Sequence, residues 1–147
     1  MYYKDKVFYE CKNFPPSGYS TIMLFGFIFT KKTESEYSGK TKYHEEFHLN
    51  QYTDCFGLGL VLAILSAFVL FAFNIVSLWM ISLVLLPLFL FYFWYGINFI
   101  FQLIKFRDWD TAYKNVIFER QAYKLGEEWY LPCEKQTKYT SFSFLKY

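Results

Sequence analysis

The sequence has few of the residues that would place it in several common protein classes. Its 147 residues include only 7 glycines, 3 cysteines and 2 histidines. So few glycines and cysteines exclude a collagen-like chain and a small fold held together by disulfide bonds. The net charge of +2 gives no broad basic surface, so we expect no nucleic-acid partner. The three cysteines have no metal-site spacing and fit reduced thiols in a cytosolic compartment.

Charge is absent from one long segment. No Asp, Glu, Lys, Arg or His occurs from Cys55 to Ile104, a run of 50 residues. A membrane-spanning helix needs about 20 apolar residues, so the run has room for two passes. The alternative is a buried hairpin in a soluble protein, but so short a chain cannot cover such a hairpin on all sides. The sequence therefore predicts a mainly α-helical integral membrane protein with a two-helix transmembrane hairpin.

The two passes divide near the middle of this run. Asn74 and Ser77 are typical turn residues, so we expect a first pass over residues 54–73 and a second over 78–103. Pro87 is expected to kink the second pass. In the first pass, small residues recur every four positions, which would let a partner helix approach closely; Gly and Ala are also simply frequent in membrane helices. These small residues are Gly59, Ala63 and Ala67.

Basic residues flank the outer ends of the hairpin, whereas the turn between the passes has no charge. By the positive-inside rule, we expect both termini to lie in the cytoplasm. The expected partner of the hairpin is the lipid bilayer. The flanking basic residues are Lys40, Lys42, Lys105, Arg107 and Lys114.

The flanks of the hairpin have their own predicted structure. Residues 6–10 and 19–30 are rich in β-branched and aromatic residues, and the turn signal Pro15-Pro16-Ser17-Gly18 between them indicates an N-terminal β-hairpin. Thr41 is a candidate N-cap for a helix that leads into the first pass, and Asp110 for a helix over residues 111–125. We expect one structural unit made of four segments, which are residues 1–40, 41–54, 55–104 and 105–147.

The two histidines form a specific motif, His44-Glu45-Glu46-Phe47-His48, which has the pattern H-E-x-x-H. On a helix, His44 and His48 fall within about 40° of each other, so both imidazoles can bind one Zn²⁺. Glu45 lies about 100° away and can reach a water beside the metal without binding the metal itself. Glu46 points to the opposite side. The competing interpretation is a solvated helix that carries two histidines.

A catalytic zinc needs a third protein ligand. No third histidine exists, so the ligand must be a carboxylate or a lone cysteine. Glu119 is central in the helix expected after the hairpin, and the small residue Ala122 three positions later would let that helix pack closely. Three other carboxylates are nearer the predicted helix ends, namely Asp110, Glu127 and Glu128.

The combination of His44-Glu45-x-x-His48 with Glu119-x-x-Ala122 resembles the gluzincin branch of the zinc metallopeptidases. The chain also resembles a group of small bacterial membrane proteins of uncharacterised function. That group has H-E-x-x-H-x-x-Q before a membrane hairpin with an aromatic W-Y-G segment, and an F-E-R-x-A-Y segment after the hairpin. The matching segments here are residues 44–51, 94–96 and 118–123, within a likeness that extends from about Gly26 to Tyr147.

The resemblance implies a role for each residue. His44, His48 and Glu119 would bind Zn²⁺, and Glu45 would act as general base. With no spare histidine to stabilise an oxyanion, Tyr113, Tyr123 or Arg120 would have to do so. Gln51 shares the helix face of the ligands and is either a residue that supports them or an exposed polar residue. An edge strand would hold the substrate backbone, and the candidate strand comprises Leu24, Phe25, Gly26, Phe27, Ile28, Phe29 and Thr30.

We therefore expect a small cytosolic zincin-like helical site on a multi-pass protein of the bacterial inner membrane. Its expected activity is zinc-dependent hydrolysis of peptides or membrane proteins near the cytoplasmic membrane face. The alternative is a non-catalytic membrane protein whose metal site or H-E-x-x-H helix is only structural, closed by a fourth protein ligand. A pore or transporter is disfavoured, because the predicted passes contain no ionisable groups of the kind that mark transport.

Overall fold

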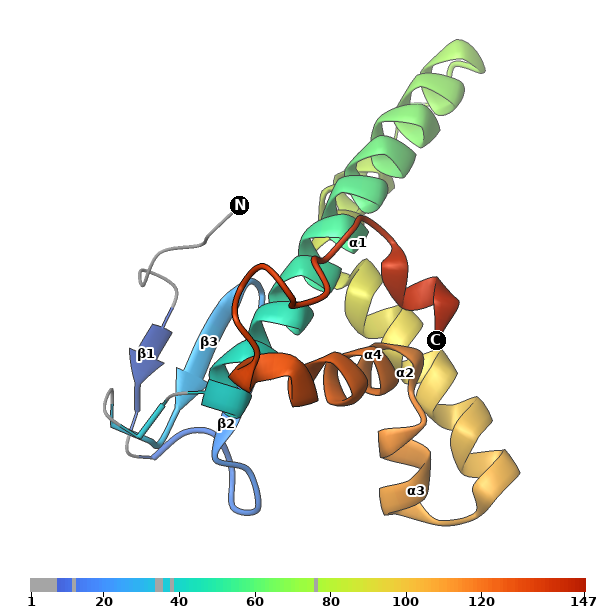
Figure 1. Cartoon of the computed structure of the whole chain (residues 1–147). Helices are drawn as coiled ribbons and strands as arrows, with labels where there is room; N and C mark the ends of the chain where they lie inside the picture. Colours follow the sequence, from blue (N-terminus) through green and yellow to red (C-terminus); the bar gives the residue numbers. More distant parts are fainter. Residues whose placement is uncertain (1–7, 12, 34–35, 38, 76) are drawn as a thin grey trace. The chain divides into compact units, whose positions relative to one another are not determined.

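The computed structural model describes residues 8–11, 13–33, 36–37, 39–75 and 77–147. The chain is mostly helical and divides into two compact units. One unit comprises residues 1–50 and 117–147, and the other comprises residues 51–116. The long helix α1, Gly39–Ala72, belongs to both units (Figure 1).

A small three-stranded sheet lies in the first unit. Its strands are β1 (Phe8–Glu10), β2 (Thr21–Leu24) and β3 (Phe27–Thr30), in the order β1-β3-β2. β2 and β3 are antiparallel, with Leu24 opposite Phe27. The two turn residues between them, Phe25 and Gly26, have φ angles of 51° and 81°. Two left-handed residues give the turn that matches the natural twist of a β-hairpin, so the chain reverses here.

The predicted hairpin is therefore wrong in its position. Residues 8–10 pair with β3 in a parallel arrangement, not as the partner of an antiparallel hairpin turned at Pro15–Gly18. The segment from Leu24 to Thr30 is also not one edge strand. It contains the end of β2, the turn and all of β3, and β3 is the central strand of the sheet. The residues 6–7 of the expected first arm lie outside the described residues.

Helix α1 begins at Gly39, two residues before the predicted N-cap Thr41. The hydroxyl of Thr41 accepts a hydrogen bond from Nζ of Lys32 instead, at 3.1 Å. Gly39 lies against the indole of Trp129, because a Cβ added at Gly39 would lie 2.8 Å from that ring. The start of α1 is thus packed against the segment that follows α4.

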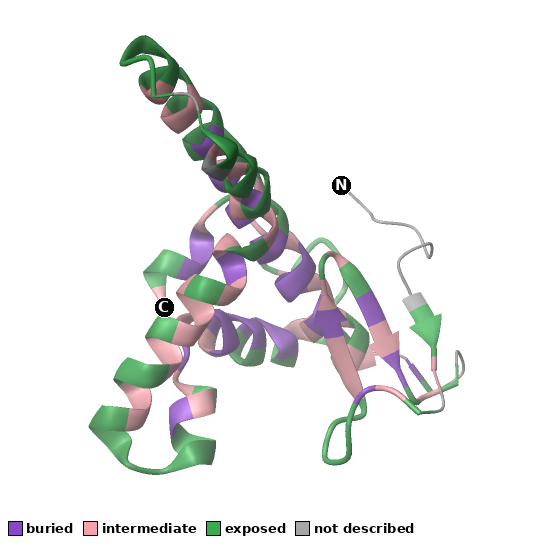
Figure 2. Cartoon of the chain, turned by 180° about the vertical axis from the view of Figure 1, so that it is seen from behind, coloured by how far each residue is buried: buried purple, intermediate pink, exposed green. Residues whose placement is uncertain are grey.

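The second unit contains the apolar hairpin. α1 ends at Ala72, and Asn74 takes a left-handed φ of 55°, as expected of a turn residue. The returning segment is a 3₁₀ helix, η1 (Leu78–Leu85), followed by α2 (Leu86–Phe106). The structure thus has two helices long and apolar enough to cross a membrane, Gly39–Ala72 and Met80–Phe106. Much of their apolar surface is exposed (Figure 2).

Pro87, which was expected to kink the second pass, marks the change from a 3₁₀ helix to an α-helix. It lies in the first turn of α2, where a missing backbone N–H costs no helical hydrogen bond. The preceding residues form the 3₁₀ helix η1 instead. Across the hairpin, a Cβ added at Gly59 would lie 2.6 Å from Cα of Pro87. The absence of a side chain at Gly59 is what lets the two backbones approach here.

The helix predicted over residues 111–125 is divided in two. α3 (Trp109–Lys114) is capped by Asp108, whose carboxylate accepts from the backbone N–H of Thr111 at 2.8 Å, and not by Asp110. It ends at Asn115, whose side-chain amide donates to the carbonyl of Thr111 at 2.8 Å. α4 (Ile117–Gly126) then begins in the other unit.

Two short 3₁₀ helices complete the chain, η2 (Glu127–Tyr130) and η3 (Ser143–Lys146). η3 packs on α4, with the rings of Phe118 and Phe144 4.7 Å apart. Next to them, the buried amide of Gln121 donates to Oγ of Ser143 at 2.7 Å. The C-terminal segment therefore holds α4, the helix that carries Glu119, in place within its unit.

Candidate metal centre

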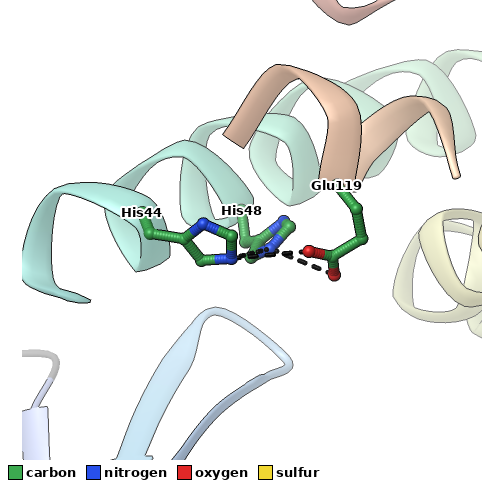
Figure 3. Close-up of side chains that lie close together, drawn as sticks. All are labelled: His44, His48 and Glu119. Atoms are coloured by element: carbon green, nitrogen blue, oxygen red, sulfur yellow. Dashed lines mark hydrogen bonds and ion pairs between the residues drawn. The ribbon is translucent and has the colours of Figure 1, made fainter. Parts of the chain in front are cut away.

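Three side chains from two helices converge in the first unit (Figure 3). His44 and His48 lie one turn apart on α1, and their Nε2 atoms are 3.1 Å apart. Glu119 comes from α4. Its Oε2 lies 3.4 Å from Nε2 of His44, and its Oε1 lies 3.3 Å from Nε2 of His48. The structure thus brings together the two histidines of the H-E-x-x-H motif and the carboxylate predicted to complete the site.

The two helices meet because small and apolar residues fill the space between them. Ala122 and Leu125 of α4 form a buried cluster with Phe47 of α1. Gly126, at the end of α4, lies beside His44, since a Cβ placed there would come within 3.9 Å of the histidine. Ala122 is fully buried, in agreement with the need for a small residue one turn after Glu119.

The donor atoms have the spacing that a tetrahedral zinc site requires. Zn²⁺ binds nitrogen and oxygen ligands at about 2.0–2.1 Å, and tetrahedral angles then separate neighbouring donors by about 3.3–3.4 Å. The two imidazole Nε2 atoms are 3.1 Å apart, and they lie 3.4 and 3.3 Å from two different oxygens of the Glu119 carboxylate. One donor atom from each of the three residues lies within 4.8 Å of the others. Two imidazoles and one carboxylate are also a ligand set that zinc commonly takes. The three residues therefore form a group that could hold one metal ion, and their donor chemistry suits zinc.

Within the described part of the chain, this group of candidate ligands has three members. The other carboxylates considered from the sequence are placed elsewhere. Glu127 is exposed and lies 3.9 Å from Lys40, and Glu128 accepts hydrogen bonds from the backbone N–H and hydroxyl of Thr137. Asp110 is an exposed residue of α3. A structural zinc would usually have four protein ligands, so a set of three favours a site that also binds a water or substrate.

The buried carboxylate of Glu119 is stabilised in its charged form. The residue is only 3% exposed, and burial alone would raise its pKa. The nearby charge of His48 and the hydrogen bonds from both imidazoles outweigh this effect, so the pKa lies well below the usual range. Glu119 is therefore ionised at neutral pH, as a metal ligand must be.

The pKa of Glu45 is shifted in the opposite direction. The residue is 8% exposed, and burial raises its pKa although the two histidines and Lys32 act in the other direction. The charge of Glu119 adds to the rise. A carboxylate with a raised pKa beside the two imidazoles can accept a proton near neutral pH more readily than an exposed one. Glu46 lies on another face of α1, where its carbonyl accepts from the side chain of Asn50.

The structure distinguishes among the residues predicted to assist the site. Tyr123 lies one turn after Glu119, with its ring 4.9 Å from that of His44. Arg120 is half-buried, and its buried Nε–H has no acceptor within the described residues. Tyr113 belongs to α3 in the other unit. Gln51 lies one turn beyond His48 on α1 and is fully buried, so it is not the exposed polar residue of the alternative interpretation.

Two residues near Glu45 were not predicted from the sequence. Tyr37 is buried, and its pKa is raised by that burial and by the charges of Glu45 and Glu46. Lys32, which follows β3, reaches Thr41 of α1 with its ammonium group. Both lie in the connection between the sheet and α1, and a pattern of spacing along one helix contains no information about them.

Comparisons with protein-family models, with curated proteins and with solved structures found no match to this chain.

Proposed function

We propose that this protein is a membrane-embedded, zinc-dependent metallopeptidase of the gluzincin type that hydrolyses peptide bonds near the cytoplasmic membrane face. The observation that carries the proposal is the convergence of His44, His48 and Glu119, each of which offers one ligand atom within 4.8 Å of the others. A buried carboxylate, Glu45, directly follows the first ligand in the sequence. This combination of a three-ligand set and an adjacent base is the arrangement needed for metal-assisted hydrolysis.

Zn²⁺ bound here would supply a water with a pKa lowered towards about 7 and would polarise the carbonyl of the substrate. Glu45 takes a proton from the attacking water and passes it to the leaving amine, because its raised pKa lets it bind and release that proton. Tyr123 of α4 has its ring beside that of His44. Its hydroxyl can donate a hydrogen bond to the negative charge that develops on the substrate oxygen.

The site lies close to the apolar segment along one continuous helix. His48 precedes Cys55, where the charge-free run begins, by seven residues of α1, or about 10 Å of helix. Two helices of sufficient length and apolar character support insertion as a hairpin. The basic residues at the outer ends favour cytoplasmic termini in a bacterial inner membrane.

A non-catalytic metal site that only joins α1 to α4 is the competing function. It requires a fourth protein ligand, and within the described residues the group has three members. The buried Glu45 also favours the enzyme, because a purely structural metal has no need of an ionisable group that costs free energy to bury.

The decisive experiment compares two neighbouring glutamates in the zinc-loaded protein in detergent micelles. We expect the parent to cleave members of a library of quenched fluorogenic peptides. Glu45→Gln should keep its zinc and lose activity by about 10²–10⁴-fold, the usual contribution of a general base. Glu46→Gln is the matched control and should keep both its zinc and its activity. A Glu45→Gln protein that cleaves at the parental rate would refute the mechanism, and a parent that binds zinc but cleaves nothing would favour the structural alternative.

The membrane arrangement has a separate test with an impermeant maleimide on intact cells. Cys133 is exposed near the C-terminus, and in a Cys11→Ser background Asn74→Cys adds a new thiol in the turn between the apolar helices. We expect the thiol at position 74 to be labelled from outside and Cys133 only after the cells are permeabilised. The reverse pattern would overturn the proposed orientation.

A further inference from the structure

The segment that follows β3 places a lysine beside the candidate metal centre. Nζ of Lys32 donates a hydrogen bond of 3.1 Å to Oγ1 of Thr41. Thr41 precedes Glu45 by four residues, so it lies one turn before it on the same side of α1. Side chains of a helix lean towards its N-terminus, so the carboxylate of Glu45 leans towards the turn where this ammonium is bound. The charge of Lys32 does act on Glu45.

Lys32 is held in this place by its backbone. Its N–H donates to Oγ1 of Thr30 at 3.1 Å, and Thr30 is fully buried at the end of the central strand. The hydroxyl of Thr30 in turn donates to the carbonyl of Ser20 and lies 2.9 Å from Oγ1 of Thr21. The neighbouring Lys31 differs, because it is exposed and its ammonium donates to the carbonyl of Pro16.

Lys32 brings a positive charge to the turn of α1 that precedes Glu45. An ammonium group has three N–H donors, and within the described residues the structure shows one donated, to Thr41. A half-buried cation with donors to spare is best satisfied by an anionic group of a ligand.

We propose that Lys32 recognises a carboxylate of the substrate, so that the enzyme acts on peptides with a negative charge close to the bond that is cut. The carboxylate comes either from the C-terminus of the peptide or from an acidic side chain. This proposal rests on the proposed function, since it assigns a substrate class to the same site.

The test measures binding of two small hydroxamates to the zinc-loaded full chain in micelles by calorimetry. Both bind metal through the hydroxamate. One is succinic acid monohydroxamate, and the other has a carboxamide in place of its carboxylate. We expect the parent to bind the carboxylate form about tenfold more tightly, as a charge-assisted hydrogen bond would produce. Lys32→Met should lose this preference, Lys32→Arg should retain most of it, and the matched control Lys31→Met should retain it fully.

The outcomes separate this proposal from the proposed function. Equal binding of the two hydroxamates by the parent, or a preference that survives in Lys32→Met with full zinc content, overturns the role of Lys32 alone. If neither hydroxamate binds the zinc-loaded parent, no exchangeable metal position exists and the proposed function fails as well. Because both probes share the hydroxamate, any effect of Lys32 on Glu45 cancels in their ratio.

A second pair of probes identifies the source of the carboxylate. One is a dipeptide hydroxamate with a free C-terminal carboxylate and neutral side chains. The other has an aspartate side chain and an amidated C-terminus. A stronger dependence of the first on Lys32 assigns the C-terminal carboxylate, and a stronger dependence of the second assigns an acidic side chain. No dependence of either probe on Lys32 overturns the proposal.

Discussion

Nε2 of His48 lies 3.3 Å from Oε1 of Glu119, although the two residues come from helices separated by the whole apolar hairpin. The same carboxylate reaches Nε2 of His44 with its other oxygen. Each carboxylate oxygen of Glu119 therefore faces one of the two imidazole nitrogens. This relationship joins a sequence motif on one helix to a carboxylate on another, and the three side chains together could hold a metal ion.

Metal binding should depend on Glu119 more than on any exposed carboxylate. We expect Glu119→Gln to weaken zinc binding by at least about 100-fold, since losing a ligand costs more than losing an outer hydrogen-bond partner, which costs 10–100-fold. Zinc content after dialysis and competition with a chelator measure the effect. The matched control is Glu127→Gln, an exposed carboxylate that should change nothing. Full zinc content in Glu119→Gln would contradict the assigned ligand set.

The two buried glutamates should shift the stability of the metal-free protein in opposite directions. The pKa of Glu119 lies below its ordinary value of 4.5, so its stabilisation is present above about pH 4.5 and is lost as pH falls through the lowered value. The pKa of Glu45 is raised above 4.5, so its contribution is present below that pH and is lost as pH rises through the raised value.

We therefore expect metal-free Glu119→Gln to unfold at a lower temperature than the parent at pH 7, and Glu45→Gln to unfold at the same or a higher temperature. The difference for Glu45→Gln should vanish near pH 4.5, whereas that for Glu119→Gln should persist there. Melting curves in chelator between pH 3 and 8 measure both. A Glu45→Gln protein that is less stable than the parent at pH 7 would show that burial of the ionised carboxylate does not destabilise the parent.

Patterns local to one helix were enough to predict that His44, His48 and Glu119 come together. The i, i+4 spacing of His44 and His48 needs only a helix, and the Glu119/Ala122 pair needs only a second helix that packs closely. The structure has both, with Ala122 buried against Phe47. The break between α3 and α4 was not predictable from the hydrophobic period, because it depends on local hydrogen bonds of Asn115, whose side-chain amide and backbone N–H both donate to the carbonyl of Thr111.

Long-range pairing explains the remaining differences. Composition indicated strands on both sides of Pro15–Gly18, but it could not show that Phe25 and Gly26 would adopt the left-handed conformations that reverse the chain. The order β1-β3-β2 then makes β3 central. In the same way, Lys32 gains its place beside Thr41 only through contacts between the sheet and α1, which leave no periodic signal in the sequence.

Tyr123 should contribute to turnover and not to metal binding. Its ring packs 4.9 Å from that of His44, and it extends from the same helix as Glu119. We expect Tyr123→Phe to retain zinc and to reduce kcat by about 10²-fold or more with little change in KM, as removal of one oxyanion donor does. Tyr43→Phe is the control, because that ring packs against Phe47 on α1. An unchanged kcat in Tyr123→Phe would exclude the hydroxyl from catalysis.

The closest approach within the apolar hairpin makes a prediction that is independent of the site. A Cβ at Gly59 would lie 2.6 Å from Cα of Pro87, which is backbone and cannot move aside without shifting η1 or α2. We expect Gly59→Ala to destabilise the hairpin by about 1–3 kcal/mol, the usual cost of overpacking. Gly57, on the same helix, has nothing within 4 Å of an added Cβ, so Gly57→Ala is the matched control and should be neutral or slightly stabilising. Thermal unfolding of both variants in the same detergent measures the difference, and equal stability of the two would show that the helices do not meet at Gly59.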